Sequence, residues 1–261
     1  MKTVKIGCCG FPTSRKKYYS LFKLVELQNT FYNLPKTEWA KKIREEAPPE
    51  FEFTVKAWQV ITHPHTSPTW RKLKTSPPGV KENYGWLKPT KENIEAFNAS
   101  LSIARTLGSK IIILQTPRSL PFNNESIKWV DEFFETIKGF LRKDEYVGWE
   151  PRGKWADNVD VLKKILCKHG VIHVVDIFKK KPVCTPDGIT YIRLHGIGGE
   201  VNYRYKYTDS DLEELADQVI GMESRTIYVL FNNVYMLDDA RRFYEILSRK
   251  AEAIGQAIDV Q

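Results

Sequence analysis

Eight short apolar segments recur along this chain, and most of them close on a polar or charged side chain. They are residues 5–9, 25–29, 51–56, 111–115, 147–150, 172–176, 191–195 and 227–232. A strand that ends in Glu, Lys, Gln, Asp, His or Asn is unfavourable in a hydrophobic core, because the polar side chain would be buried there. It suits the carboxyl rim of a barrel of parallel strands, where enzymes of that fold keep their active sites.

Amphipathic segments separate these strands. Helices are expected at 37–47, 90–107, 124–141, 158–169, 210–220 and 237–254, with Thr37, Thr90 and Ser210 as N-caps. Alternating strands and helices predict a parallel sheet, and eight strands predict a closed (β/α)8 TIM-type barrel. The first helix must be short, at 12–23, and the sixth short or missing, at 178–188. We expect a single domain over 1–261, a length that such barrels commonly have.

Alternation along the strands predicts which side chains point into the barrel. Phe53 and Val55 share one face of the third strand, so Lys56 points inward. The same argument turns Glu26 and Arg193 inward. Glu26 and Lys56 lie on neighbouring strands and can pair. Such charges must be paired or hydrated, so one interpretation is a buried ionic network without chemistry.

The positive charge of the chain is concentrated near its start. Residues 1–90 contain 16 Lys and Arg against 7 Asp and Glu, whereas residues 91–261 contain 24 against 25. A localised positive field favours anionic partners such as phosphates or nucleic acid. A lysine-rich solubilising surface is the alternative.

The composition excludes several classes of protein. No apolar run reaches the roughly 18 residues of a membrane span. The chain enters a strand at once, and we expect no signal peptide. We therefore expect a cytoplasmic protein with no membrane partner. Cys8, Cys9, Cys167 and Cys184 show no Cys-x-x-Cys spacing, and we expect buried thiols.

A long proline-rich insertion at about 62–89 follows the third strand. It contains Trp70, Tyr84 and Trp86, which would be unusual in a disordered loop. We expect an ordered cover on the carboxyl face.

Several motifs resemble one known family in the same order. They are Val25-Glu-Leu-Gln-Asn-Thr-Phe-Tyr-Asn-Leu-Pro35, Phe51-Glu-Phe-Thr-Val-Lys-Ala57, Ile61-Thr-His63, Leu114-Gln-Thr-Pro117, Trp149-Glu-Pro-Arg152, Tyr191-Ile-Arg-Leu-His-Gly196 and Phe231-Asn-Asn233. The chain resembles the YecE-like family, domain of unknown function 72, over nearly its whole length. The resemblance implies a TIM barrel and no particular reaction. It marks Glu26, Asn29, Thr30, Tyr32, Lys56, His63, Gln115, Glu150, Arg152, His195 and Asn232.

Two kinds of catalysis fit these residues. Glu150, Asp176 and His195, with Glu26 and His63, could hold a divalent metal that activates water. Lys56, Arg152 and Arg193 at the same rim would repel a cation, so a metal is not favoured and the cofactor is left open. Without a metal, His195 can act as a base beside Glu150 or Asp176, and the arginines can clamp a carboxylate or phosphate.

Binding without turnover is the third hypothesis. Basic and aromatic residues alternate in the insertion, at Trp70, Arg71, Lys72, Lys74, Tyr84 and Trp86, and again in 202–207. Such a mixture can contact nucleic-acid phosphates and stack on bases. The glycine-rich stretch 196–199 can present N–H groups to an anion, although a tight turn explains it equally well.

We therefore expect an enzyme that acts on an anionic small molecule or nucleic acid, with phosphoester hydrolysis on nucleic acid or a nucleotide as the first choice. The alternatives are a metal-free lyase or isomerase of a small carboxylate or sugar phosphate, and a non-catalytic nucleic-acid-binding barrel. The expected catalytic residues are Glu26, Lys56, Glu150 and His195. The expected ligand-binding residues are Asn29, Tyr32, His63, Gln115, Arg152, Asp176, Arg193, Tyr205, Asn232 and Asn233. The oligomeric state is left open.

Overall fold

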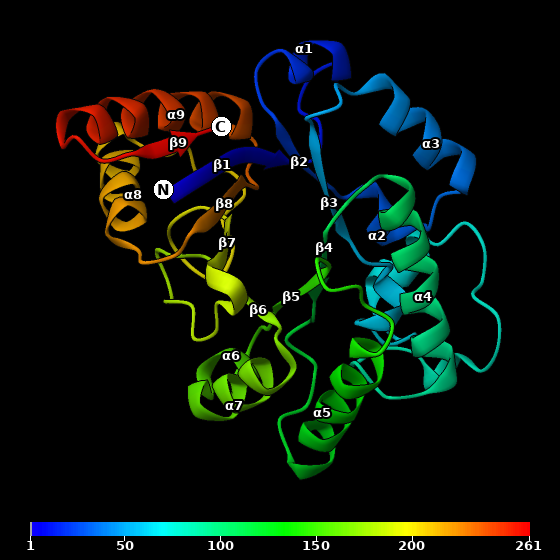
Figure 1. The fold of residues 1–261 in the computed structure, drawn as a ribbon. Helices are drawn as coiled ribbons and strands as arrows, with labels where there is room; N and C mark the ends of the chain where they lie inside the picture. Colours follow the sequence, from blue (N-terminus) through cyan, green and yellow to red (C-terminus); the bar gives the residue numbers. More distant parts are fainter. Residues whose placement is uncertain (1) are drawn as a thin grey trace. The chain divides into compact units, whose positions relative to one another are not determined.

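The computed structural model describes residues 2–261, and its strands form one parallel sheet (Figure 1). The strands are β1 (Lys2–Cys9), β2 (Leu24–Leu27), β3 (Glu52–Lys56), β4 (Ile111–Gln115), β5 (Tyr146–Glu150), β6 (Ile172–Val175), β7 (Ile189–Leu194), β8 (Thr226–Phe231) and β9 (Ile258–Val260). They are hydrogen-bonded in the order β2-β3-β4-β5-β6-β7-β8-β1-β9, and β1 also pairs with β2. The order is that of an eight-stranded closed parallel sheet with one added strand. The fold is therefore the expected (β/α)8 barrel.

Helices separate the strands as the sequence pattern predicts. They are α1 (Arg15–Tyr19), α2 (Asn29–Tyr32), α3 (Thr37–Glu46), α4 (Lys91–Thr106), α5 (Asn124–Lys138), α6 (Lys154–Asp157), α7 (Val159–His169), α8 (Asp209–Gly221) and α9 (Met236–Ala253). The first βα connection contains only the five-residue α1. The sixth contains only the 3-10 turn Pro186–Gly188. Both irregular units are thus confirmed.

The helix caps show which local signals were interpreted correctly. Thr90 caps α4, because its hydroxyl accepts the backbone N–H of Asn93. The cap of α8 is Thr208, not the predicted Ser210. Thr208 accepts from the N–H of Asp211, whose side chain accepts in return from the N–H of Thr208. This reciprocal pair of bonds, a capping box, satisfies two helix-end donors and explains the earlier start of α8.

The chain divides into two compact units. Unit 1 comprises residues 1–26, 47–52 and 173–261, and unit 2 comprises residues 27–46 and 53–172. In unit 1, β1 pairs with β8 along six residues. Its start also pairs with β9 and its end with β2 (Figure 1). The sequence pattern did not predict β9. Its three residues carry little signal of their own and are held by main-chain bonds between Gln261 and both Val4 and Ile6.

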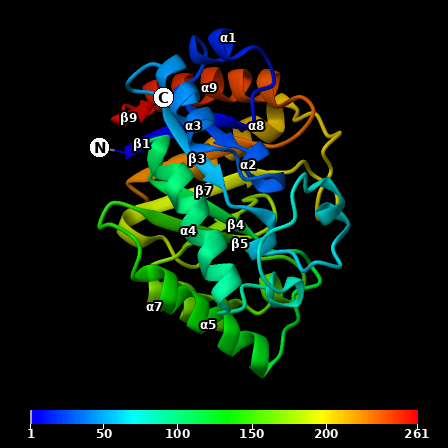
Figure 2. The ribbon, with the colours of Figure 1, turned by 90° about the vertical axis from the view of Figure 1, so that its right-hand side faces the viewer.

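In unit 2, β3, β4 and β5 are paired in parallel, and the insertion 62–89 follows β3. Its chain contains the 3-10 helices Pro68–Lys72 and Lys81–Asn83, and Figure 2 shows this segment beside α2. Trp70 packs edge-on against Tyr84, and its indole N–H donates to the carbonyl of His63 at 2.9 Å. The insertion is therefore a packed structure whose own side chains stabilise it.

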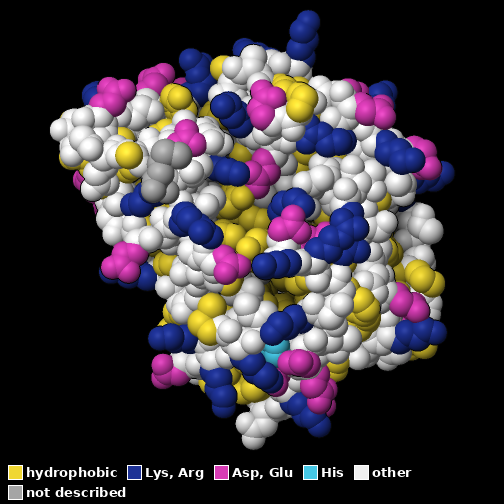
Figure 3. Space-filling view, in the orientation of Figure 1, with side chains coloured by type: hydrophobic (Ala, Val, Ile, Leu, Met, Phe, Trp, Pro, Cys, Tyr) yellow, Lys and Arg dark blue, Asp and Glu magenta, His cyan; other side chains and the backbone are white. Residues whose placement is uncertain are grey.

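The surface and the helices give two further findings. Within residues 2–261, no helix is both long enough and apolar enough to span a bilayer. On the face drawn in Figure 3, basic and acidic side chains are interspersed.

Candidate functional site

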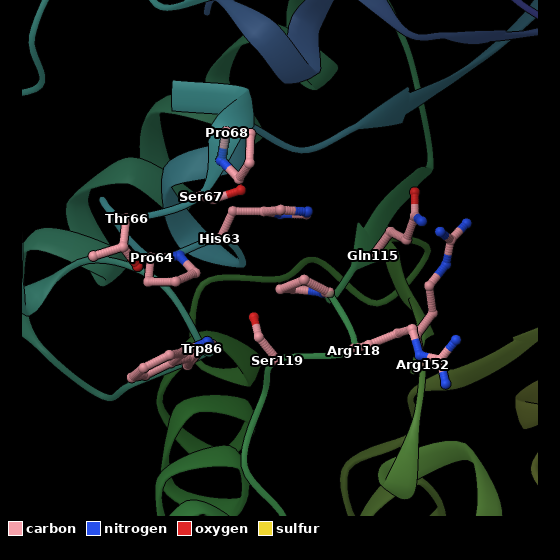
Figure 4. A pocket seen from close by; sticks show the side chains of 11 residues that line it. His63, Pro64, Thr66, Ser67, Pro68, Trp86, Gln115, Arg118, Ser119 and Arg152 are labelled. Carbon is pink, nitrogen blue, oxygen red and sulfur yellow. The ribbon is translucent and has the colours of Figure 1, made fainter. Parts of the chain in front are cut away.

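A cavity of about 500 Å³ lies in unit 2, between the insertion and the loops that follow β4 and β5. Figure 4 shows the side chains that border it. They are His63, Pro64, Thr66, Ser67, Pro68, Trp86, Gln115, Pro117, Arg118, Ser119 and Arg152. This lining contains two arginines and no Asp or Glu, and it therefore suits an anion.

His63 reaches the cavity from the insertion, and its ring points toward Gln115 and Arg152 (Figure 4). The ring is nearly buried, packs edge-on against Phe31 with 5.1 Å between centroids, and meets the Thr62 hydroxyl through Nδ1 at 2.8 Å. Burial, together with the positive charges of Lys56 and Arg152, lowers the pKa of His63 to about 3. The imidazole is therefore neutral at neutral pH.

Arg152 and Glu150 stand at the end of β5. Two guanidinium nitrogens of Arg152, Nε and Nη2, donate to the same carboxylate oxygen of Glu150 at 3.2 and 3.1 Å. Both side chains are largely shielded from solvent, so the pair fixes the direction of the guanidinium. This pairing orients Arg152 toward the cavity it borders.

Lys56 ends β3 and is almost entirely buried. Its ammonium lies 4.1 Å from the centre of the Phe31 ring, a cation–π contact, and its carbonyl accepts the Thr30 hydroxyl. Phe31 thus touches both Lys56 and His63. Because both groups contact the Phe31 ring, the Lys56 ammonium and the His63 imidazole lie close to the same side chain in unit 2.

Of the other predicted residues in unit 2, Gln115 borders the cavity, whereas Tyr32 and Asn29 do not. Lys72 lies over the Tyr32 ring at 4.4 Å, and Asn29 is exposed at the start of α2. Arg118 also borders the cavity and was not predicted as a site residue. A signal existed, since Arg118 follows Gln115-Thr-Pro in the loop after β4.

The strand ends of unit 1 form a different arrangement. Arg193 donates through Nη2 to Glu26 at 2.8 Å, and the Tyr191 hydroxyl donates to the other oxygen of Glu26 at 2.9 Å. Neither charged side chain has exposed surface. A ligand cannot reach these two groups in this conformation, so burial supports the structural interpretation for Glu26 and Arg193.

The two adjacent cysteines of β1 are buried, and Cys9 lies beside this pair, with its Sγ 3.8 Å from Nη2 of Arg193. Burial raises the pKa of Cys8 to about 12, and burial followed by the charge of Glu26 raises that of Cys9 well above its usual value. Neither is a thiolate at neutral pH. Cys184 is also buried, but Cys167 is exposed on α7, so the expectation of a buried thiol is wrong for Cys167.

His195 and its neighbours form a second polar group in unit 1. The backbone N–H of His195 donates to Asp176 at 3.1 Å, Asn232 meets its Nδ1 at 3.2 Å, and Lys179 pairs with Asp176 at 2.7 Å. The rings of Tyr203 and His195 pack edge-on, with 6.0 Å between their centroids. The structure thus brings the predicted residues Asp176, His195 and Asn232 together.

Tyr205 and Asn233 are used within the fold of unit 1. The Tyr205 hydroxyl donates to Asp211 at 2.7 Å, and this bond is the main reason why the pKa of Tyr205 rises to about 12. Asn233 donates to the carbonyl of Tyr205 and to Asp239. Both side chains stabilise the loop before α8, and their ligand-binding role stays a prediction.

The glycine-rich stretch 196–199 makes a tight turn. Gly196 has φ +82°, and a Cβ there would lie 2.1 Å from the carbonyl oxygen of Asn202. Its N–H donates to the Tyr207 hydroxyl at 2.8 Å. That N–H is therefore committed within the protein, which favours the turn over the anion-binding interpretation at Gly196.

A metal site was the less favoured hypothesis. In the part of the chain that the structure describes, no three His, Cys, Asp or Glu side chains are grouped so that they could hold a metal ion. His63, the one such side chain in the cavity lining, is surrounded there by cationic and neutral residues. The unit 2 cavity therefore fits an anion better than a cation.

Solved structures resemble the fold of this chain over almost its whole length. A DUF72 family protein from Enterococcus faecalis V583 has a TM-score of 0.72 at 18% identity and covers 95% of this chain and 98% of its own. One from Thermotoga maritima MSB8 has a TM-score of 0.66 at 22% identity, with 94% and 99% covered. A D-tagatose 3-epimerase-like protein has a TM-score of 0.56 at 16% identity, with 98% of both chains covered.

The family model described as "Protein of unknown function DUF72" matches residues 12–260. The chain therefore belongs to the DUF72 family, as its motifs indicated. A search of the curated proteins found no match.

Proposed function

We propose that the unit 2 cavity binds a phosphate-bearing small molecule and that the protein hydrolyses a phosphoester there. The observation that carries this proposal is the lining of the cavity: Arg118, Arg152 and the Gln115 amide, with no Asp or Glu among the bordering residues. Guanidinium groups bind phosphate through charge-assisted hydrogen bonds that neutral donors do not match. The hydroxyls of Ser67 and Ser119 add two donors.

His63 is the group in this cavity that can move a proton. In the free protein, burial and two nearby cations keep it neutral. A bound phosphate dianion opposes those cations, so binding raises the pKa of His63 toward neutrality. His63 then takes a proton from a water molecule whose oxygen bonds to phosphorus. The ester P–O bond breaks, and the departing alkoxide takes a proton from solvent.

Isomerisation of a sugar phosphate is the second candidate. Lys56 is nearly buried beside Phe31, an environment in which an ammonium can polarise a carbonyl. One of the similar barrels is described as D-tagatose 3-epimerase-like, which supports this candidate at the level of fold. Hydrolysis and isomerisation both require that the phosphate group binds at the arginines of this cavity.

Nucleic acid as a partner has less support in the insertion than the sequence indicated. The Trp70 and Tyr84 rings pack on each other, and Tyr84 is buried. Arg71 and Lys74 are exposed and remain able to contact phosphates. We therefore place a small phosphorylated ligand ahead of a polymer.

The test is calorimetric titration of the full chain with inorganic phosphate at low salt. Arg118 is exposed, so Arg118→Met should leave the fold intact and lower the affinity for phosphate by about tenfold, the value of one charge-assisted bond. Arg142→Met is the matched control, because Arg142 is an exposed arginine of the same unit outside the cavity. Equal affinities for both variants, or no phosphate binding, would overturn the proposal.

Release of 4-nitrophenol from 4-nitrophenyl phosphate tests the reaction. His63→Gln should keep phosphate binding within a few fold and lose turnover. If His63→Gln turns over at the wild-type rate, His63 does not carry the reaction. Phosphate binding without any release of 4-nitrophenol would leave isomerisation as the better candidate.

A further inference from the structure

Trp86 borders the cavity with its backbone in a conformation that large residues rarely adopt. The φ angles of Gly85, Trp86 and Leu87 are +85°, +57° and +54°. Three successive left-handed residues are unusual, and each non-glycine member carries a steric penalty. In Figure 4, Trp86 and Thr66 lie on the side of His63 opposite to Gln115 and Arg152.

Hydrogen bonds from several directions hold this turn in place. The N–H groups of Gly85, Trp86 and Leu87 donate to the carbonyls of Val60, Thr62 and Ile61 at 2.7–3.1 Å. Buried Asn93 of α4 accepts from the Gly85 N–H and donates to the carbonyls of Gly85 and Lys88. The fold therefore enforces a left-handed turn at a position where glycine or asparagine would carry less strain. Such strain is typical of functional sites.

The contacts of the indole do not explain why a tryptophan stands there. Its Nε1 is buried, and within residues 2–261 no acceptor lies within hydrogen-bond distance of it. Lys88 lies over the ring at 5.8 Å and does not border the cavity. Trp86 borders the cavity together with Pro64 and Thr66, and its side chain is therefore placed to contact a ligand there.

We propose that Trp86 stacks on a planar ring of the ligand whose phosphate lies at Arg118 and Arg152. The ligand class is then a nucleoside monophosphate. This inference rests on the proposed function, because the phosphate must bind at the cationic side of the same cavity. A cavity of about 500 Å³ has the size of pockets that enclose small organic ligands. Base–aromatic stacking is a recurrent source of affinity for nucleotides.

The experiment compares three probes by calorimetric titration of the full chain: inorganic phosphate, ribose 5-phosphate and adenosine 5′-monophosphate. The wild type should bind adenosine 5′-monophosphate about tenfold more tightly than ribose 5-phosphate. Trp86→Asn removes the ring and suits a positive φ, so it should fold, as a thermal melt would verify. It should lose the tenfold preference and keep its affinity for inorganic phosphate.

Two further variants serve as controls. Trp86→Phe keeps an aromatic ring and should keep most of the preference. Phe140→Leu removes an exposed ring of the same unit outside the cavity and should change nothing. Equal wild-type affinities for the two organic phosphates, or a preference that survives in Trp86→Asn, would refute stacking while leaving phosphate binding intact. Absence of phosphate binding would instead refute the proposed function itself.

Discussion

In unit 1 the inward-pointing charges are bonded to each other, whereas in unit 2 comparable groups border a cavity. Arg193 and Glu26 form a pair with no exposed surface, and Tyr191 completes it. Arg152 also pairs with a carboxylate, that of Glu150, yet its side chain reaches the cavity beside His63. A charged strand end therefore predicts a polar interior, and only its partners and exposure show whether it can meet a ligand.

The largest effect should come from breaking the unit 1 pair. Arg193→Met removes the guanidinium 2.8 Å from Glu26 and should lower the free energy of unfolding by about 3–5 kcal/mol. Urea denaturation measures this loss. The double variant Arg193→Met with Glu26→Leu should recover most of it, since an apolar pair avoids the cost of burying charge. A single variant as stable as the wild type would show that the pair does not stabilise unit 1.

A substitution in unit 2 should have the next largest effect. A Cβ at Gly85 would lie 2.5 Å from the nitrogen of Pro64, and φ there is +85°. Gly85→Ala should therefore cost about 3 kcal/mol, from backbone strain and overpacking together. It should also weaken phosphate binding, because the displaced peptide carries His63. Gly108→Ala is the control: φ is also positive at Gly108, but nothing lies near its Cβ.

The third prediction concerns the pH dependence that His63 confers. Its pKa is about 3 when folded against about 6.5 in the unfolded chain, so below pH 6.5 the unfolded state binds the proton and the folded state does not. The contribution of His63 to the free energy of unfolding is fully present above pH 6.5 and decreases as the pH falls toward 3. The loss between pH 7 and pH 5 is about 2 kcal/mol.

Urea denaturation of the wild type and of His63→Gln at pH 7 and at pH 5 tests the direction of this pH dependence. The variant should lose about 2 kcal/mol less than the wild type between pH 7 and pH 5. An identical loss would mean that His63 titrates normally. The cavity would then lack the positive environment that distinguishes it from the buried pair of unit 1.

The smallest effect should come from Tyr191→Phe. This change removes one hydrogen bond to a carboxylate and should cost about 1.5 kcal/mol. Tyr228→Phe is a matched control, because its hydroxyl donates to Glu52 at 2.6 Å, where Glu52 is partly exposed. Tyr228→Phe should cost less, because water can replace the lost bond. Equal losses of unfolding free energy in the two variants would mean that water reaches Glu26 as easily as it reaches Glu52.

The position of the polar strand ends was predictable because it depends on short-range periodicity. Alternation separated Phe53 from the inward-pointing Lys56, and Arg44 of α3 lies over the Phe53 ring at 5.0 Å. Alternation also turned Arg193 and Glu26 inward, but their bond to each other was not predicted. The Thr90 cap and the short first helix also follow from adjacent residues. The predicted pairing of Glu26 with Lys56 stays a prediction.

It was harder to predict which residues form the site. His63 and Trp86 lie 23 residues apart in the insertion, and Arg118 comes from the loop after β4, so that only the folded chain brings all three to one cavity. The Trp86 turn depends on Asn93 and on three carbonyls of residues 60–62, none of which is adjacent to it in the chain. The Ser210 error was of a different kind, because Thr208 and Ser210 can both cap a helix and lie two positions apart in the sequence.

The sequence by itself determined the class of fold, the order of its strands and helices, and the carboxyl ends of the strands as the place where polar groups gather. Those properties follow from hydrophobic periodicity and from residues close together in the chain. Only the tertiary structure decided that Arg193 is sealed against Glu26, while Arg118, Arg152, His63 and Trp86 enclose a cationic cavity. Partner choice and solvent exposure depend on contacts between distant segments, and these form only when the chain has folded.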